Sequence, residues 1–182
     1  MGRVMAIDAS TKSTGIAIFD EDTKELIKYF CLTCEGNSVK YRILQMVKQI
    51  MLVYKETWST KVVMEDVLLE DVGHNTNVFK SLHYLQAAVV LKFYEKEGLE
   101  VTLMPCGTWR SKCGFKGGPA ATREILKAQS MAFVKDKYGI EANDDVSDAI
   151  CIGWAYVNKG ADLVGGQSSK PAPKKKKQEF AF

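Results

Sequence analysis

Histidine is scarce in this sequence, since His74 and His83 are the only two among 182 residues. So small a supply leaves no convincing Ser/His/Asp or Cys/His arrangement for nucleophilic catalysis. Long apolar runs are also missing, because the longest, around "LQAAVVLKFY", is too short and too interrupted to span a bilayer. The opening residues "MGRVMAIDAS" lack the apolar region of a signal peptide. We therefore expect a cytoplasmic protein with no membrane partner.

Cysteine is present, but without the pattern of a zinc site. The five cysteines are an odd number, and without a secretory signal we expect reduced thiols. Cys31 and Cys34 form a single C-x-x-C pair, whereas zinc needs a second pair, which Cys106 and Cys113 do not supply at the usual spacing. Cysteines pack well in strands and cores, so packing is the favoured interpretation.

The net charge of +3 is concentrated at one end of the chain. Residues 161–182 hold five of the 25 basic residues and two of the 22 acidic ones, which leaves 20 of each in residues 1–160. This segment is rich in Gly, Ser, Pro and Lys, and we expect a disordered tail. Its lysines either attract phosphates without regard to sequence or keep the protein in solution.

Hydrophobic periodicity predicts five strands and four helices. The strands are expected at 3–8, 14–20, 25–34, 61–67 and 100–105, and the helices at 38–58, 77–98, 121–139 and 144–160. Short polar turns join the first three strands into an antiparallel meander. The later strands alternate with helices, which favours parallel pairing. We therefore predict that residues 1–160 form one α/β domain, a five-stranded mixed sheet flanked by helices.

The predicted fold would bring four carboxylates of the sequence close together. Asp8 ends the first strand and Glu65 ends the fourth, and these strands are expected to be parallel neighbours with ligands at that edge. Asp145 and Asp148 are three residues apart at a helix start and share one face. Four converging carboxylates cannot all stay ionised without cations, and Mg²⁺ or Mn²⁺ are the natural choice. Two such ions would clamp a phosphodiester, one activating water and the other stabilising the leaving oxygen.

Each carboxylate also has a structural interpretation. Asp145 would serve as a helix N-cap with Asp148 reinforcing the helix dipole, and taken alone this is the better interpretation. Asp8 would form an Asx-turn with the hydroxyl residues that follow it. Glu65, next to Asp66, would be a solvated strand end. The structural interpretation needs all three coincidences together, so we favour a joint metal site.

The segments "AIDASTKSTGIAIFD", "VVMEDV" and "DDVSDAICIGWAY" together resemble the RuvC family of Holliday-junction resolvases, which have the ribonuclease-H-like fold. The resemblance spans about residues 3–158 and is greater to the phage-encoded members, which act in the cytoplasm of a prokaryotic host. The family's catalytic metal ligands are an Asp on strand one, a Glu ending strand four and a D-x-x-D-A pair. They fall on Asp8, Glu65, Asp145 and Asp148.

The resemblance implies a homodimeric, Mg²⁺-dependent endonuclease with two ions per active site, in which Mn²⁺ substitutes for Mg²⁺. Such an enzyme nicks branched DNA symmetrically, at Holliday junctions or forks, and leaves 5′-phosphate and 3′-hydroxyl ends. Two departures matter. Asp144 precedes Asp145, so the ligand register could slip by one residue. The family's aromatic wedge after strand four has only Phe79 as a candidate, which leaves strict junction preference and any cognate sequence open.

The segment "TWRSKCGFKGGPAATRE" is expected to be a Gly- and Lys-rich loop that contacts DNA phosphates. The candidate contacts there and beside the first turn are Arg110, Lys112, Lys116, Arg123 and Lys12. The alternative is a solvated loop with core aromatics, and Trp109 alone is expected in the core. The small residues of the helix at 77–98, Ser81, Ala87 and Ala88, mark either a dimer face or a core face.

Other functions fit less well. The opening segment superficially resembles the first phosphate loop of actin-like ATPases and sugar kinases, but such proteins need a second Gly-rich phosphate motif and a longer, two-domain chain. We therefore expect no nucleotide cofactor. A DNA-binding module that does not cut would gain nothing from carboxylates facing phosphates. A ribonuclease or a broader DNA-debranching nuclease with the same metal chemistry remains an alternative.

Overall fold

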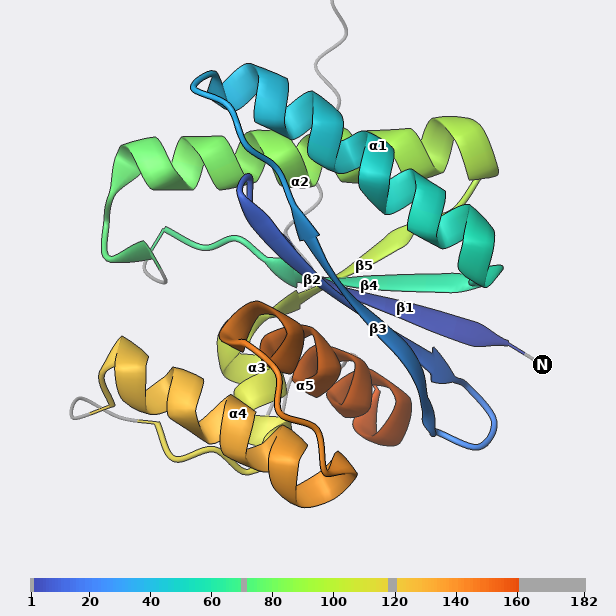
Figure 1. Ribbon diagram of the computed structural model, residues 1–182, viewed down its shortest axis with the longest axis vertical. Helices are drawn as coiled ribbons and strands as arrows, with labels where there is room; N and C mark the ends of the chain where they lie inside the picture. The colour runs from blue at the N-terminus through green and yellow to red at the C-terminus, as the bar shows by residue number, and fades with distance from the viewer. Residues whose placement is uncertain (1, 70–71, 118–120, 161–182) are drawn as a thin grey trace, which may run out of the picture.

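A computed structural model describes residues 2–69, 72–117 and 121–160 of the chain (Figure 1). Its centre is a five-stranded sheet in the order β3-β2-β1-β4-β5. The strands are β1 (Arg3–Asp8), β2 (Ser13–Asp20), β3 (Leu26–Thr33), β4 (Lys61–Asp66) and β5 (Val101–Pro105). The first three strands pair antiparallel, and β1, β4 and β5 pair parallel. The predicted mixed sheet, including the β1–β4 neighbours, is confirmed.

Helices cover both faces of this sheet (Figure 1). The helices α1 (Val39–Thr57) and α2 (Thr76–Glu97) lie on one face. On the other face α5 (Asp144–Lys159) lies against the strands, and α3 (Cys106–Cys113) and α4 (Arg123–Tyr138) pack around it. Among the described residues, no helix is long and apolar enough to cross a membrane.

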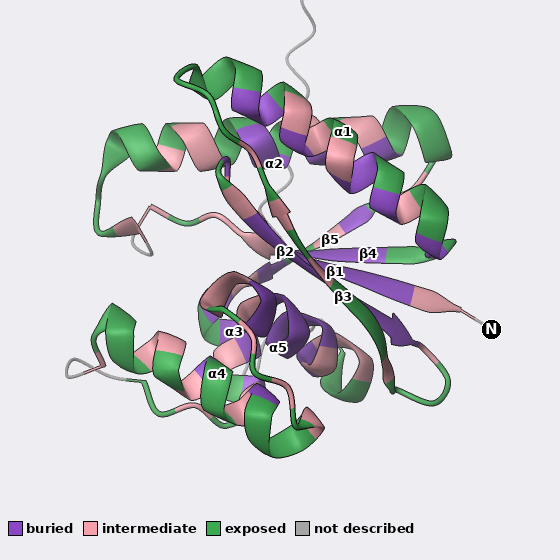
Figure 2. Cartoon of the chain, viewed as in Figure 1, coloured by how far each residue is buried: buried purple, intermediate pink, exposed green. Residues whose placement is uncertain are grey.

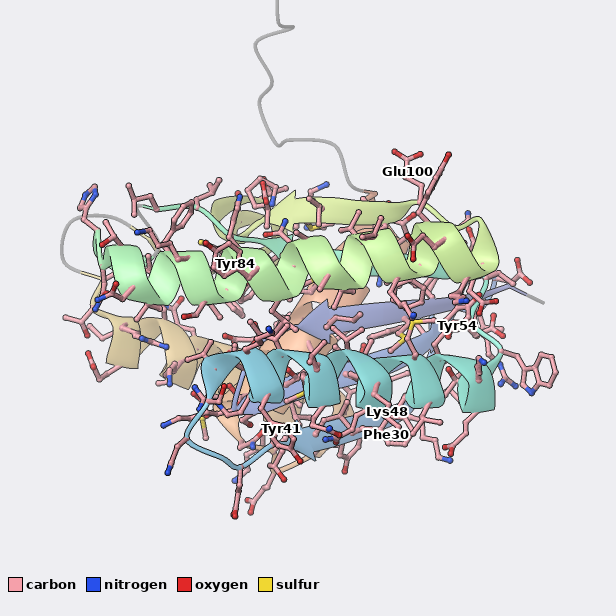
Figure 3. All side chains as sticks on the ribbon, turned by 90° about the horizontal axis from the view of Figure 1, so that it is seen from above. Phe30, Tyr41, Lys48, Tyr54, Tyr84 and Glu100 are labelled. Atoms are coloured by element: carbon pink, nitrogen blue, oxygen red, sulfur yellow. The ribbon has the colours of Figure 1, made fainter. Side chains whose placement is uncertain are left out.

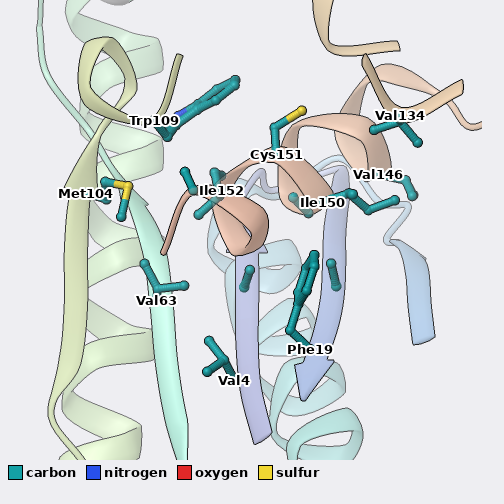
Figure 4. Packing of buried hydrophobic residues seen from close by; sticks show 14 of the residues in the cluster. Val4, Phe19, Val63, Met104, Trp109, Val134, Val146, Ile150, Cys151 and Ile152 are labelled. Atoms are coloured by element: carbon teal, nitrogen blue, oxygen red, sulfur yellow. The ribbon is translucent and has the colours of Figure 1, made fainter. Parts of the chain in front are cut away.

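Strand periodicity explains why both faces are covered. Successive side chains of β1 point to opposite faces, so Met5 and Ile7 pack under α1 and α2 while Val4 and Ala6 pack under α5. All four are fully buried (Figure 2). Figure 4 shows the α5 side, where Phe19 of β2 lies under the helix. A strand buried on both faces reads as a continuous apolar run, as "VMAI" does here.

The helix boundaries follow local capping chemistry. Ser38 precedes α1 and its hydroxyl accepts from the amide of Tyr41 at 3.3 Å. Gly98, expected at the end of the second helix, takes the left-handed C-cap conformation with φ +61°. Asn143 caps α5, because its side-chain oxygen accepts from the amide of Val146 at 3.0 Å. The N-cap interpretation of Asp145 is therefore wrong.

One helix was absent from the sequence prediction. The first residues of the segment expected to be a loop lie in α3, which starts directly after Pro105 and is followed by its C-cap Gly114, with φ +80°. The remaining helices and strands lie within a few residues of their predicted bounds. The predicted tail, residues 161–182, falls outside the described residues, so the domain boundary at 160 stays a prediction.

Candidate active site

The sheet topology brings Asp8 and Glu65 to the same edge. Asp8 is the last residue of β1, and Glu65 follows Met64, which pairs with Ile7 in the parallel β1–β4 ladder. On the other side of β1, Asp8 pairs with Gly15 of β2. Both acidic side chains are half-buried at the carboxyl ends of parallel strands, where α/β sheets place their ligands.

A close approach between β2 and α5 adds the remaining two carboxylates. A Cβ atom on Gly15 would lie 1.9 Å from the carbonyl oxygen of Asp145, so only glycine lets the helix start sit against this strand. The hydroxyl of Ser13, two residues earlier, donates to the carboxylate of Asp145. Asp148 lies one turn further along α5. The structure thus places Asp8, Glu65, Asp145 and Asp148 close enough to act on one another, while their role as metal ligands stays a prediction.

Electrostatic coupling among the four groups supports this description. Burial raises the pKa of Asp8 well above its usual range, and Glu65, Asp148 and Asp145 raise it further in that order. The guanidinium of Arg110 acts in the opposite direction. Burial also raises the pKa of Asp148 to about 6, against the lowering effects of the Ser130 hydroxyl and Arg110. The charges of Asp144 and Asp145 raise the pKa of Asp148 further. Excess negative charge is therefore concentrated around Asp8.

The neighbouring Asp144 is held elsewhere. Its carboxylate forms an ion pair with the Lys127 ammonium of α4, and that hydrogen bond lowers the pKa of Asp144. Asp145, in contrast, contacts Ser13 and contributes to the field at Asp8. The geometry therefore favours Asp145 over Asp144 as the group that faces the site.

The structural interpretations of Asp8 and Glu65 also fail. The amide of Ser10, which an Asx-turn at Asp8 would use, donates instead to Thr14 Oγ1 at 3.0 Å. Glu65 is no solvated strand end, because its Oε2 accepts from Trp109 Nε1 at 2.8 Å. The carboxyl group of Asp66 is also engaged, since its Oδ1 accepts from Gln86 Nε2 at 2.9 Å.

The four carboxylates lie near one another, but they do not form a complete coordination sphere for a metal ion. Among the described residues, no group of three or more His, Cys, Asp or Glu side chains is arranged to hold a metal ion. Glu65 and Asp145 instead present oxygens to Trp109 and Ser13. Asp148 Oδ1 is buried and has no hydrogen-bond partner in the described part of the chain. A buried carboxylate oxygen of this kind is costly unless a cation or a donor reaches it.

The predicted DNA contacts have different surroundings. Lys12, Lys116 and Arg123 are exposed. The half-buried Arg110 faces the carboxylates, with its guanidinium 4.9 Å from the Trp109 ring centre. Phe79 is half-buried near the start of α2 and stacks on His83, with 4.7 Å between ring centres. For all five side chains, contact with DNA stays a prediction.

Lys112 must be removed from the DNA-binding set. It is only 3% exposed, and its ammonium donates to the carbonyl oxygens of Lys159 at 3.1 Å and Gly160 at 2.6 Å. These carbonyls end α5, where a cation offsets the helix dipole and the unpaired acceptors. The lysine therefore has a structural role, joining the end of α3 to the end of α5.

Several residues of the site were missed by sequence reasoning. Trp109 was expected as a core residue, and no contact with an acidic residue was predicted for Trp109, Ser13 or Gln86. Each contacts an acidic residue that is distant in sequence. The one local signal was Gly15, a glycine inside a strand, which often marks close approach of another backbone.

The strand order and the helices on both faces are those of a ribonuclease-H-like fold. No protein-family model matches the sequence, and no curated protein sequence matches it. Solved structures do. T. thermophilus RuvC in complex with a Holliday junction substrate matches at a TM-score of 0.66 and 13% identity, over 90% of this chain and 100% of that chain.

Two further resolvases have the same fold. The yeast mitochondrial Holliday junction resolvase Ydc2 matches at a TM-score of 0.55 and 13% identity, over 86% of this chain and 78% of that one. Fowlpox virus resolvase in complex with Holliday junction DNA matches at a TM-score of 0.52 and 15% identity, over 85% and 96%. At these identities the likeness establishes the fold.

Proposed function

We propose that this chain is a Mg²⁺-dependent endonuclease that resolves Holliday junctions and other branched DNA in the cytoplasm of a prokaryotic host cell. The observation that carries the proposal is the convergence of Glu65, Asp145 and Asp148 on the half-buried Asp8, at the carboxyl edge of a ribonuclease-H-like sheet. Structures with this fold include two resolvases bound to Holliday junction DNA. The proposed reaction is phosphodiester hydrolysis that leaves 5′-phosphate and 3′-hydroxyl ends.

The residues fit a pair of hard divalent cations. Every proposed ligand is a carboxylate, the donor type that Mg²⁺ and Mn²⁺ prefer. The described charges that act on Asp8 are three acids against one cation, Arg110, so the site favours added positive charge. The buried Asp148 Oδ1 is one oxygen that a cation would reach. When bound, two such ions supply an activated water and stabilise the leaving oxygen.

The chain's own residues then have distinct roles. Asp8, which lies in the field of the other three acids, would hold the cations together with Glu65, Asp145 and Asp148. Arg110, half-buried beside the acids, would contact a phosphate oxygen as DNA enters. In free protein the same guanidinium partly neutralises Asp8 and Asp148. These two roles of Arg110 account for a positively charged side chain so close to a proposed cation-binding site.

Exposed basic residues around this edge would position the DNA backbone. Lys12 follows β1, and Lys116 follows α3. Gln129 of α4 holds the backbone of Lys116 from both sides, accepting from its amide at 2.8 Å and donating to its carbonyl at 3.1 Å. Arg123 begins α4. Contacts of this kind fix the position of a duplex without reading its sequence, while Phe79 remains the candidate wedge.

A homodimer would place two such sites on one four-way junction, and we assign its interface to α1 and α2. These helices lie side by side on one face, and Figure 3 shows Tyr84 on the outer side of α2. Their exposed apolar side chains include Leu44, Leu52, Tyr84, Leu91 and Tyr94, between 52% and 69% exposed. An apolar groove between the helices is lined in part by Val47, Met51 and Ala88. A surface of this character suits a second copy of the chain.

The dimer is tested by the mass of the protein in solution. Wild type is expected to sediment as a dimer and Leu91→Glu as a monomer, because the glutamate would be buried without a partner. The matched control is Met131→Glu on α4, which is similarly exposed but on the other side of the sheet. A monomeric wild type, or an unchanged Leu91→Glu dimer, would contradict this interface.

A panel of matched substrates tests the proposed activity. Linear, forked and four-way DNA of the same sequence, together with an RNA–DNA hybrid, are incubated with the protein and either Mg²⁺ or Ca²⁺. We expect Mg²⁺-dependent nicking that favours branched DNA. Preferential cutting of the hybrid would indicate a ribonuclease, and equal cutting of all DNA forms would refute the resolvase assignment. Binding without any cutting would indicate a non-catalytic module.

A further inference from the structure

The side chain that holds Glu65 comes from the helix that the sequence did not reveal. Met104 of β5 pairs with Glu65 of β4, and α3 begins two residues later. Trp109 therefore lies about one helical turn beyond the strand that neighbours Glu65. Its indole Nε1 donates to Glu65 Oε2 at 2.8 Å, across 44 residues of sequence. The contact joins α3 to the proposed active site.

The packing around Trp109 fixes the orientation of its side chain. The residue is 0% exposed and lies among Met104, Cys151 and Ile152, as Figure 4 shows. The ring of Phe115 packs edge-on against it, with 6.0 Å between ring centres and 81° between the ring planes. This packing fixes the direction of the N–H bond, so the position of the acceptor oxygen is fixed with it.

The chemistry of indole separates this contact from the others at the site. An indole N–H only donates, and unlike Arg110 it carries no charge that competes with a cation. A buried indole N–H needs an acceptor, and here the acceptor is a proposed metal ligand. Donors that orient ligand carboxylates typically change metal affinity or activity by about 10–100-fold when removed.

We propose that Trp109 is a positioning residue that fixes the Glu65 carboxylate for cation binding. The inference rests on the proposed function, because it assumes that Glu65 is a metal ligand. Trp109 acts through Glu65 and touches neither DNA nor the reacting atoms. Because its N–H lies one hydrogen bond from a ligand oxygen, its resonance also reports whether a cation is present.

The first test measures Mn²⁺ affinity by calorimetry without DNA. Trp109→Phe keeps an aromatic ring in the core but removes the donor, and we expect it to bind Mn²⁺ about 10–100-fold more weakly than wild type. The matched control is Trp154→Phe, which removes an indole whose ring packs on Phe133 at 5.1 Å in the same core. That variant is expected to keep wild-type affinity. Equal affinity of folded Trp109→Phe and wild type would overturn the proposal.

The second test needs no substitution at Trp109. The ¹⁵N-labelled protein has three indole N–H resonances, from Trp58, Trp109 and Trp154. The variants Trp58→Phe and Trp154→Phe assign two of them, and the third then belongs to Trp109. In metal-free protein, Glu65→Gln should shift the Trp109 resonance, because a neutral amide oxygen is a weaker acceptor than a carboxylate. Paramagnetic Mn²⁺ should broaden the same resonance and spare that of Trp58, which is 79% exposed and follows α1.

These outcomes separate the two proposals. An unchanged Trp109 resonance in Glu65→Gln overturns the positioning role, even where Trp109→Phe fails to fold. Failure of wild type to bind Mn²⁺ refutes the proposed function, and a shift in Glu65→Gln would then leave the contact as structural only. Binding that is equal in wild type and Trp109→Phe refutes the positioning role alone.

Discussion

At the scale of single residues, Asp144 and Asp145 are adjacent in sequence but have different side-chain partners. Lys127 holds Asp144, whereas Ser13 holds Asp145 beside Asp8. The resemblance to RuvC-type resolvases favoured Asp145 from the D-x-x-D-A pattern alone. The structure adds a physical reason, since a carboxylate already paired with a lysine is less available to a cation.

This difference predicts the behaviour of two isosteric variants. Asp145→Asn should lower Mn²⁺ affinity and cleavage by at least about tenfold, because it removes a charged ligand oxygen at nearly constant shape. Asp144→Asn should lose only the ion pair with Lys127, which is partly exposed and worth about 1 kcal/mol or less. Calorimetry and a nicking assay measure both. The reverse order of effects would move the ligand register by one residue.

The raised pKa of Asp148 predicts how stability depends on pH. The folded protein holds the proton up to about pH 6, whereas the unfolded chain releases it near 3.8. Metal-free protein should therefore lose stability as pH rises through this window, by on the order of 2–3 kcal/mol. Asp148→Asn should lack this loss. Urea unfolding of both proteins in EDTA, at about pH 4 and about pH 7.5, measures their free energies of unfolding. If the difference in this free energy between wild type and Asp148→Asn were the same at both pH values, the assigned burial of Asp148 would be contradicted.

How far the site could be predicted depends on the range of each interaction. Asp8 and Glu65 could be placed because a strand end is a local feature and parallel neighbours share an edge. Trp109 and Ser13 could not, since their hydrogen bonds to acidic residues join segments 44 and 132 residues apart. Lys112 was wrongly assigned to DNA binding, because the sequence of a glycine-rich segment does not show whether a lysine side chain is exposed to solvent or contacts the end of a helix.

At the scale of elements, α3 shows where periodicity fails. The helix has eight residues and no side-chain N-cap, and it is surrounded by Pro and Gly. Such a helix is too short to be stable alone, so its formation depends on tertiary contacts. Those contacts are the burial of Trp109 and the bonds from Lys112 to the end of α5. The longer helices have caps and apolar faces that sequence reasoning can detect.

Removing the Lys112 ammonium tests its structural role. Lys112→Met keeps the stem of the side chain but leaves the carbonyls of Lys159 and Gly160 without this donor, so the free energy of unfolding should fall by about 1–3 kcal/mol. Lys116→Met is the matched control. Lys116 is exposed, so its loss should change stability by less than about 0.5 kcal/mol while weakening DNA binding. Urea unfolding and a DNA-binding titration distinguish the two lysines, and equal stability of both variants would contradict the capping role.

At the scale of the whole molecule, the fold could be predicted almost completely, although the sequence matches no family model. Strands that are buried on both faces of a sheet have to be apolar along their whole length. Helices that pack one face against the sheet have to carry apolar residues with a period of 3.6. Similar architecture at 13% and 15% identity to known resolvases shows how few identical residues this requires. A partner surface is different, because the exposed leucines of α1 and α2 share the sequence pattern of core residues.

The charge distribution predicts a separate role for residues 161–182. Their five lysines hold the chain's net positive charge, so their deletion should weaken junction binding at low salt and reduce the slope of affinity against salt by several units. Cleavage should persist, because the proposed ligands lie between Asp8 and Asp148. Fluorescence anisotropy at increasing salt measures both quantities. Unchanged affinity at low salt would assign the segment to another role.

The most direct measurement compares wild type with Asp8→Asn on a four-way junction in Mg²⁺. Asp8 lies in the field of all three other acids, and the substitution removes its charge at nearly constant shape. We expect junction binding to be retained and the nicking rate to fall by about a thousandfold or more, the equivalent of about 4 kcal/mol of lost transition-state stabilisation. Full activity of the purified variant would contradict a metal-dependent active site at Asp8.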